Sequence, residues 1–328
     1  MSAPAARTTL ALCAALAGVF AAGRAHAQAD FVGTRALGMG EALRANAAGA
    51  AGPLLNPAGM SLSKGYVIEA SYGLRIEDLG HHVLVSVVDS VTARIAAGLF
   101  YEYIHSSPKL GFNWAGGKVQ NAKLTREGHV AGLSLSMALA DRFLIGATLK
   151  YLHLNTSAPL PDGTVPDSLS LDRVNSVTFD VGVLIKAHPK FNLAVVGQNL
   201  WDHGSRETPA SLGLGLAFIP IPSLSIDFDA LVNFTGYKTP VYDTANPSVV
   251  KDFSFRATAR IGPGVEWLIA GKVPLRLGVI YDTGLTSTYL TAGIGYFSPS
   301  FAIDLSYRGK VSGGIENFLM LGIRIFIN

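Results

Sequence analysis

Short segments in which apolar residues alternate with polar or small residues recur from about residue 66 to the end of the chain. In 301–308, for example, Phe301, Ile303 and Leu305 are each separated by a small or polar residue. A period of two places the apolar side chains on one face of a β-strand and the others on the opposite face. No uninterrupted run of about 18 apolar residues follows residue 27, which excludes transmembrane helices. We therefore expect an all-β protein.

The face opposite the apolar one is rich in glycine, alanine and serine. A soluble β-sandwich also alternates, but its polar face lies in water and carries many lysines and glutamates. Here only 15% of the 328 residues are charged, and the mean hydropathy is +0.34, whereas soluble proteins average about 25% charged residues. Bulky residues on one face and small ones on the other are typical of a membrane β-barrel with lipid outside and a polar lumen.

The alternating segments number about fourteen, and bacterial outer-membrane barrels have an even number of antiparallel strands. The expected strands are 66–74, 82–89, 92–105, 128–140, 143–154, 174–187, 191–200, 209–219, 223–235, 253–269, 273–282, 286–297, 300–309 and 317–328. Tight connections alternate with longer ones, as in outer-membrane barrels, where the longer loops are external. The predicted external loops are 106–127, 155–173, 201–208, 236–252 and 310–316, and the short connection 283–285 breaks the pattern. This phase places both chain ends on the periplasmic side.

Residues 1–27 have the organisation of a secretory signal peptide. Arg7 precedes an apolar stretch, which ends at the small-residue site Ala25-His26-Ala27. Cys13 is the single cysteine and lies within that stretch, so the mature chain would contain no disulfide and no cysteine-based zinc site. We expect residues 1–27 to be cleaved and residues 65–328 to form a barrel in the cell outer membrane of a Gram-negative-type bacterium.

The segment 28–64, between the signal peptide and the first strand, does not alternate. Its alanine-rich part, 41–51, predicts a helix, and apolar residues such as Leu37, Met39 and Leu43 indicate burial. A barrel of about fourteen strands encloses a lumen wider than that of the smallest barrels. We therefore expect 28–64 to form a small N-terminal helical hatch inside the lumen.

Two runs in the predicted hatch resemble a known family. Residues 35–42 read Arg-Ala-Leu-Gly-Met-Gly-Glu-Ala, and residues 55–60 read Leu-Asn-Pro-Ala-Gly-Met. Together they resemble the amino-terminal signature of the FadL/PorV superfamily, whose usual form is A-L-G-M-G-G-A followed by W-N-P-A-G-L. The hatch-motif residues in this sequence are Gly38, Met39, Gly40, Asn56, Pro57 and Ala58.

The resemblance implies a fourteen-stranded outer-membrane barrel with an N-terminal hatch. FadL-like members pass hydrophobic compounds across the outer membrane, often through a lateral opening in the wall. PorV-like members instead act as partners in protein secretion or surface attachment. This sequence departs from the signature at Glu41, which replaces its second glycine, at 46–49, which replaces an acidic pair, and at Leu54-Leu55, where an aromatic residue often stands.

Asn56 and Pro57 form a turn-favouring pair on general grounds, because the asparagine side chain bonds nearby backbone and the proline fixes its own φ. One interpretation is therefore a local turn. The other is that Asn56, Pro57 and Ala58 hold the hatch against the wall beside a hydrophobic passage. A candidate exit for such a passage is the wall irregularity Gly262, Pro263 and Gly264, because a proline removes a hydrogen bond from the strand ladder.

Charged residues also fall on the predicted lumen face: Asp227, Asp229, Arg256, Arg260, Asp304, Arg308 and Arg324. The two aspartates at 227 and 229 and the arginines at 256 and 260 lie on neighbouring predicted strands. Opposite charges across neighbouring strands stabilise their pairing, so we expect these residues to brace the lumen. A conducting path or an anion-selective ring is the alternative.

The sequence predicts no enzymatic chemistry. It contains no Gly-x-Ser-x-Gly motif, and its histidines have no metal-ligand spacing. We therefore expect no catalytic residue, no cofactor and no metal. The alternative that stays open is a hydrolase whose serine and histidine meet only in space.

The functional hypothesis is passive transport of hydrophobic or amphipathic, fatty-acid-like small molecules across the outer membrane. The alternative is a PorV-like, non-transporting adapter that binds a secreted or periplasmic protein. The net charge of +3 is too small for a nucleic-acid partner. Outer-membrane lipid and lipopolysaccharide are expected partners, and the predicted loop 106–127 carries cations that either bind lipopolysaccharide phosphates or are merely solvated: Lys109, Lys118, Lys123 and Arg126.

Overall fold

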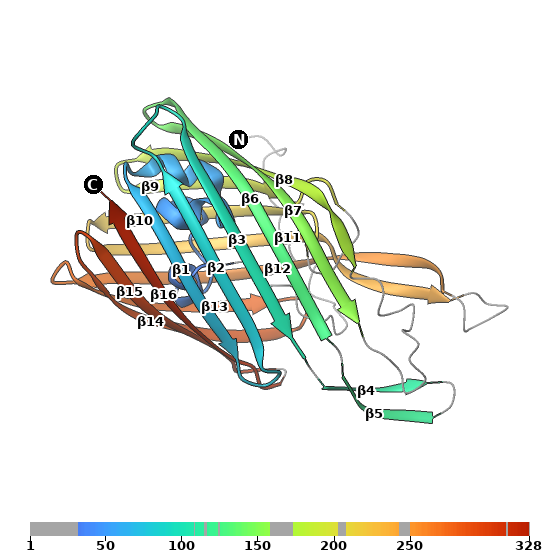
Figure 1. The fold of residues 1–328 in the computed structure, drawn as a ribbon. Coiled ribbons are helices and arrows are strands. Elements are labelled where there is room, and N and C mark those ends of the chain that lie inside the picture. Colours follow the sequence, from blue (N-terminus) through green and yellow to red (C-terminus); the bar gives the residue numbers. More distant parts are fainter. Residues whose placement is uncertain are drawn as a thin grey trace, which may run out of the picture.

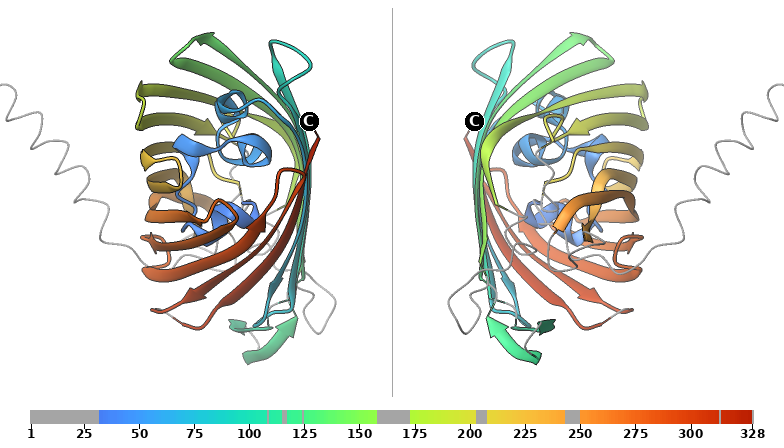
Figure 2. Two further views of the ribbon diagram at one scale, coloured as in Figure 1. Left: turned by 90° about the vertical axis from the view of Figure 1, so that its left-hand side faces the viewer. Right: turned by 90° about the vertical axis from the view of Figure 1, so that its right-hand side faces the viewer.

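The fold is a closed barrel of fourteen antiparallel strands (Figures 1 and 2), as the alternation predicts. This computed structural model describes residues 32–107, 109–114, 117–123, 125–157, 173–202, 208–242, 250–312 and 314–327. The barrel strands are β1 (Tyr66–Arg75), β2 (Gly80–Asp89), β3 (Ala96–Ser106), β6 (Thr125–Ala140), β7 (Phe143–Ser157), β8 (Val174–His188), β9 (Phe191–Gln198), β10 (Ser211–Ile221), β11 (Leu224–Tyr242), β12 (Val250–Ile269), β13 (Val273–Asp282), β14 (Ser287–Phe297), β15 (Phe301–Lys310) and β16 (Asn317–Ile327). The predicted signal peptide lies outside the described residues.

The barrel closes where β1 pairs with β16. The register runs without interruption from Tyr66 opposite Ile327 to Arg75 opposite Phe318. Closure leaves no strand edge, so the backbone hydrogen-bonding groups of the wall are satisfied within the sheet.

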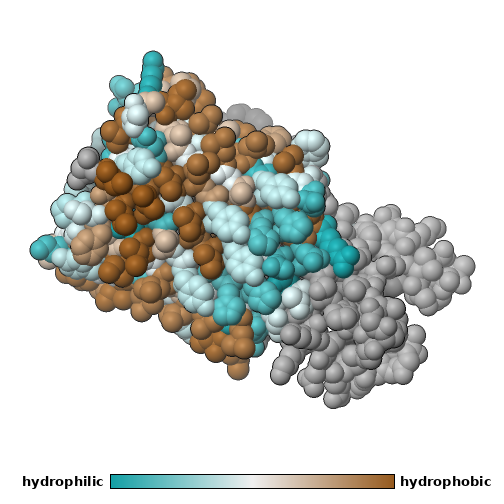
Figure 3. Space-filling model, viewed as in Figure 1, coloured by the Kyte–Doolittle hydropathy of each residue, from teal (hydrophilic) through white to brown (hydrophobic). Residues whose placement is uncertain are grey.

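The outer face of the wall is apolar. On β16, Leu319, Leu321 and Ile323 are 41%, 48% and 46% exposed, whereas Met320 between them is fully buried in the lumen. Figure 3 shows apolar residues over much of the wall and more hydrophilic residues toward one end of it. A closed wall with this outer surface is the arrangement that crosses a membrane. None of the helices in the described part of the chain is long and apolar enough to do so.

Two predicted loops contain strands. Within 106–127, β4 (Lys109–Trp114) and β5 (Gly117–Lys123) form a separate two-stranded sheet. Within 236–252, β11 and β12 continue to pair, with Thr239 opposite Ser254. Tyrosine, threonine and valine recur in these stretches and favour strands, so the ladder extends beyond the segments that alternate most clearly. Figure 1 shows both hairpins projecting from the same end of the barrel, which we name the loop end.

Residues 32–64 lie inside the barrel (Figure 2) and are called the hatch below. The expected continuous helix over 41–51 is wrong. The hatch consists of short helical turns: α2 (Thr34–Gly38), η2 (Arg44–Asn46), η3 (Gly49–Ala51), α3 (Gly52–Leu55) and η4 (Pro57–Leu62). Gly40, Glu41 and Gly49 have φ angles of 64°, 63° and 62°, and a left-handed residue ends a helix.

Candidate functional site

The lumen wall has two chemically different halves, and the hatch lies between them. Strands β2, β3, β6, β7 and β8 form the apolar half. Strands β11, β12, β13 and β15 form the charged half. Buried inward-facing residues of the apolar half pack in one cluster with the hatch: Leu84, Phe100, Val130, Leu152, Leu154 and Val174. The charged half carries Asp229, Arg260, Glu266, Arg276, Asp304 and Arg308.

Asp229 makes a buried contact between the charged half and the hatch. Its Oδ2 atom accepts hydrogen bonds from the backbone N–H groups of Leu43 and Arg44, at 3.0 and 2.9 Å. The same oxygen lies 3.0 Å from the Arg44 guanidinium, and both side chains are only 5% exposed. One carboxylate thus binds both the backbone and the side chain of the hatch turn.

Glu41 forms a second contact. Its Oε1 lies 3.0 Å from Nη2 of Arg260 and 3.3 Å from Nη1 of Arg308. Arg308 also binds Glu316, at 2.7 Å. Glu41 stands where the FadL/PorV signature has a glycine, and it keeps a positive φ. That conformation costs a non-glycine residue about 1–2 kcal/mol, which the two ion pairs offset.

A chain of five charges forms the third contact. Arg35 of the hatch lies 2.8 Å from Glu266, and Glu266 lies 2.6 Å from Arg276. Asp304 then bridges Arg276 and Arg324, each at 2.6 Å. Burial alone would lower the pKa of the Arg35 guanidinium, but the attraction of Glu266 and its hydrogen bonds raise that pKa. Arg35 therefore stays charged, and the hatch remains tied to β12.

Of the predicted lumen charges, Asp304 and Arg324 brace the neighbouring strands β15 and β16, but the predicted pairing between β11 and β12 is not formed. Asp229 lies opposite Gly262, whereas Arg260 lies opposite Leu231, so the register separates the two charges along the wall. Arg256 lies further along β12, opposite Tyr237, and Asp227 accepts a hydrogen bond from Ser225. The predicted pairing of Asp227 and Asp229 with Arg256 and Arg260 is therefore wrong, because several of these charges face the hatch instead of one another.

Charged residues of the apolar half bind each other and make no ion pair with the described hatch. Lys150 lies 2.7 Å from Asp180 and 2.6 Å from the Asn199 side chain, and His82 pairs with Glu102. Neutral contacts hold the hatch here. The Ser136 hydroxyl on β6 donates to the Ala58 carbonyl at 3.2 Å, and on the adjacent β9 the Gln198 side chain donates to the Leu54 carbonyl at 3.1 Å.

Asn56, Pro57 and Ala58 lie against β7 and β8. The Asn56 side chain accepts from the Ala58 N–H at 3.1 Å and donates to the Arg44 carbonyl at 3.0 Å. A Cβ added at Gly146 would lie 2.5 Å from the Ala58 nitrogen, so only a glycine permits this close approach. The motif thus makes a local turn and also contacts the wall.

Gly38, Met39 and Gly40 lie against the other side of the wall. The β12–β13 ladder pairs Ile261 with Tyr281 and then Gly264 with Gly278, and it leaves out the pairs between them. Pro263 lies in this gap, and a Cβ at Gly40 would be 3.2 Å from the Pro263 carbonyl oxygen. The predicted irregularity is therefore a gap in the ladder that the hatch backbone covers from inside.

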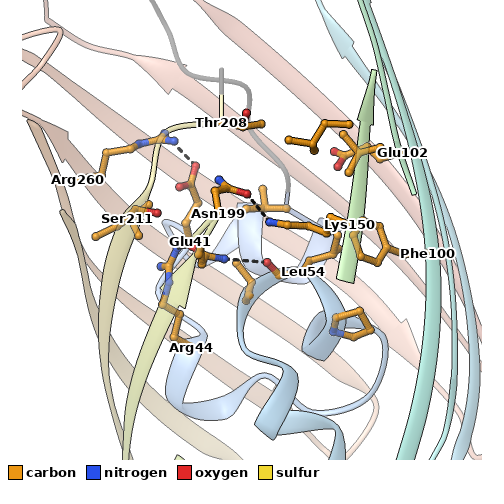
Figure 4. A pocket seen from close by; sticks show the side chains of 17 residues that line it. Glu41, Arg44, Leu54, Phe100, Glu102, Lys150, Asn199, Thr208, Ser211 and Arg260 are labelled. Atoms are coloured by element: carbon orange, nitrogen blue, oxygen red, sulfur yellow. Dashed lines mark hydrogen bonds and ion pairs between the residues drawn. The ribbon is translucent and has the colours of Figure 1, made fainter. Parts of the chain in front are cut away.

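A cavity of about 60 Å³ lies between the hatch and the wall. Leu54 and Leu55 of the hatch and Phe100, Val130 and Leu152 of the wall form its apolar side. Polar side chains also line it, including Glu102 and Lys150 on β3 and β7 of the apolar half (Figure 4). The other polar lining residues are Glu41, Arg44, Gln198, Asn199, Thr208, Ser211 and Arg260.

The hatch charges Arg35, Glu41 and Arg44 are not among the site residues expected from the sequence. The sequence does mark these three residues, because they are isolated charges in a segment rich in alanine and glycine. Among the described residues, no cluster of histidine, cysteine, aspartate or glutamate is arranged to hold a metal ion. The side chains of Lys109, Lys118 and Lys123 lie outside what the structure describes.

No protein-family model and no curated protein matches the sequence. Several solved structures share its fold. The CymD monoaromatic hydrocarbon channel superimposes with a TM-score of 0.66 at 15% identity, covering 90% of this chain and 97% of that one. A FadL homologue from Pseudomonas aeruginosa gives a TM-score of 0.64 at 14% identity, with 93% and 99% covered.

The toluene transporter TodX of Pseudomonas putida gives a TM-score of 0.61 at 13% identity, again covering 93% of this chain and 99% of that one. The fold implied by the FadL/PorV resemblance is therefore confirmed.

Proposed function

We propose that this protein is an outer-membrane channel for the passive transport of hydrophobic or amphipathic small molecules. It shares its fold with a hydrocarbon channel and a toluene transporter. The observation that carries the proposal is the cavity between the hatch and the apolar half, because it offers an apolar surface inside a wall that crosses a membrane. We orient the barrel with its longer loops outside the cell, so that the loop end is external and the hatch lies toward the periplasm.

The described conformation is closed. A cavity of about 60 Å³ is smaller than the apolar cavity of about 150 Å³ that binds benzene in an engineered protein. A substrate therefore passes only when the hatch moves. Movement away from the apolar half requires no ion pair between hatch and wall to break, whereas movement away from the charged half requires three sets to break.

The exit we propose is the gap at Pro263. This gap lies on the charged half, and the ion-paired residues Arg35 and Glu41 flank the Met39 and Gly40 that cover it. Opening the exit therefore needs a second, local movement of Met39 and Gly40 away from β12 and β13, after substrate has entered along the apolar half, and the missing ladder bonds then leave a weak point in the wall. A hydrophobic molecule in the lumen would then pass sideways into lipid.

Uptake measurements test the route. In cells of a Gram-negative host that lacks its own channel of this kind, the protein should speed uptake of a labelled monoaromatic hydrocarbon or a long-chain fatty acid. Leu152→Trp fills the cavity and should reduce uptake at least tenfold. Leu149→Trp is the matched control, because Leu149 lies on the same strand but faces outward and is 58% exposed.

A closed lumen is also compatible with the alternative function, a non-transporting adapter that binds another protein. Native mass spectrometry of gently extracted protein tests this alternative. A bound amphiphile that is lost on deletion of 32–64 supports the channel. A stoichiometric protein partner, together with uptake that Leu152→Trp leaves unchanged, would replace the channel with the adapter.

A further inference from the structure

A second, smaller hollow of about 30 Å³ lies at the loop end of the lumen. The ends of β1, β2, β6 and β15 contribute Arg75, His82, Arg126 and Arg308 to its lining. In the part of the chain that the structure describes, no carboxylate residue lines the hollow itself; the carboxylates that pair with Arg75, His82 and Arg308 lie outside its lining. The remaining lining residues are Gly80, His81, Ile104, His105 and Phe318. Three guanidinium groups and three imidazoles, one of them the buried His82, thus line one small space.

Two of these side chains have hydrogen-bonding atoms without a partner among the described residues. Arg75 uses only Nε, which donates to Asp78 at 2.8 Å, so both of its Nη atoms are available. His82 is 4% exposed, its Nε2 faces Glu102, and its Nδ1 has no partner. A buried polar atom without a partner is costly, and a ligand in the hollow would satisfy it.

The side chains around the hollow are held in place. Gly80 makes room for Arg75, because a Cβ there would lie 3.2 Å from Nη2 of Arg75. The Phe318 ring lies edge-on to His82, with centroids 6.1 Å apart, and beneath the Arg308 guanidinium at 5.5 Å. The cations are thus positioned before any ligand arrives.

We propose that this hollow binds a tetrahedral oxyanion, namely phosphate or a phosphoryl group carried by a larger molecule. Guanidinium groups bind phosphate through charge-assisted hydrogen bonds, and an imidazole protonated on both nitrogens donates from each. The donors reach the hollow from four different strands. Such an arrangement suits a tetrahedral group better than a planar carboxylate, because a carboxylate takes two donors in one plane. The source is either free phosphate entering the lumen or a lipopolysaccharide phosphate at the outer surface.

Titration calorimetry on the full-length protein in a phosphate-free, uncharged detergent tests the proposal. One arm uses inorganic phosphate, and the other uses lipid A in the same detergent. We expect saturable binding in at least one arm, and the arm that binds identifies the source. Arg75→Gln and Arg126→Gln should each weaken it about tenfold, since each removes a charge-assisted hydrogen bond.

Matched controls are Arg142→Gln, an exposed arginine in the turn between β6 and β7, and His153→Gln, an exposed histidine that does not line the hollow. Both should bind as the unaltered protein does. Altered mobility on gels of unheated samples would reveal a variant that does not fold. Because the Arg75 side chain is partly exposed, we expect Arg75→Gln to fold normally. Absence of saturable binding in both arms, or equal binding by the folded Arg75→Gln and Arg126→Gln variants, would overturn the proposal.

Discussion

The apolar and charged halves of the lumen wall hold the same hatch by different physical means. On the charged half, Arg35, Glu41 and Arg44 make ion pairs with β11, β12 and β15. On the apolar half, the hatch packs through Leu54 and Leu55 and accepts neutral hydrogen bonds from Ser86 and Ser136. Ion pairs in a buried site break at high cost, whereas packed apolar surfaces separate gradually. The hatch therefore has a fixed side and a side that can open.

The largest effect should come from breaking the fixed side. Asp229→Ala leaves the Arg44 guanidinium and two backbone N–H groups without their acceptor. Removing one partner of a buried pair costs about 3–5 kcal/mol, so the free energy of unfolding in urea should fall by that amount and ion conductance in planar bilayers should rise. Asp141→Ala, at an exposed turn, is the control. Unchanged conductance and stability would show that Asp229 does not hold the hatch.

A somewhat smaller effect is expected on the apolar half. Leu152→Ala enlarges the cavity and should lower the free energy of unfolding by about 3 kcal/mol. Because all the ion pairs remain, ion conductance should stay low while uptake of small hydrophobic compounds rises. If Leu152→Ala instead raised ion conductance as much as Asp229→Ala, the two halves would not differ in the way described.

Restoring the ladder at the gap should have a modest effect. Pro263→Ala returns an N–H group next to β13 and should stabilise the wall by about 1 kcal/mol. If substrate leaves through this gap, uptake should fall several-fold. Pro274→Ala, near the turn at the start of β13, controls for loss of a proline. Normal uptake by Pro263→Ala would place the exit elsewhere.

The smallest effect concerns Glu77, in the turn between β1 and β2 at the loop end. Burial raises the pKa of Glu77, but the hydrogen bonds donated by the backbone and side chain of Asn317 together outweigh burial and lower that pKa. A lowered pKa means that the stabilisation is complete above the ordinary glutamate pKa of about 4.3 and is lost as the pH falls through the lowered value. The melting temperature of Glu77→Gln should therefore lie below that of the unaltered protein at pH 7.

At about pH 2, where the carboxylate is protonated in both folded and unfolded chains, that difference in melting temperature should disappear. A difference that is equally large at both pH values would show that the charge of Glu77 has no part in it.

The strands could be predicted from the sequence because their pattern is local. The expected strand at 300–309 corresponds to β15 at Phe301–Lys310. The alternation of apolar and polar residues shows, residue by residue, which side chains face lipid and which face the lumen. An irregularity at Pro263 could also be expected from the sequence, because the proline ring leaves no N–H group to donate to the neighbouring strand.

The contacts of the hatch could not be predicted in this way. Arg44 and Asp229 are 185 residues apart, and Arg35 and Glu266 are 231 apart. Alternation shows that such charges face the lumen but does not show which of them meet. The positive φ of Glu41 was equally hidden, because glutamate is not a residue that marks a left-handed turn.

The fit between hatch and wall glycines implies an order of assembly. Glycines that would clash with the hatch if they carried a side chain occur around the whole circumference, including Gly146 on β7, Gly264 on β12 and Gly322 on β16. The seam between β1 and β16 is fully paired, and β1 follows the hatch directly in the chain. We therefore expect the hatch to be ordered by the time that seam closes, so that a segment that crosses no membrane takes part in shaping the wall that does.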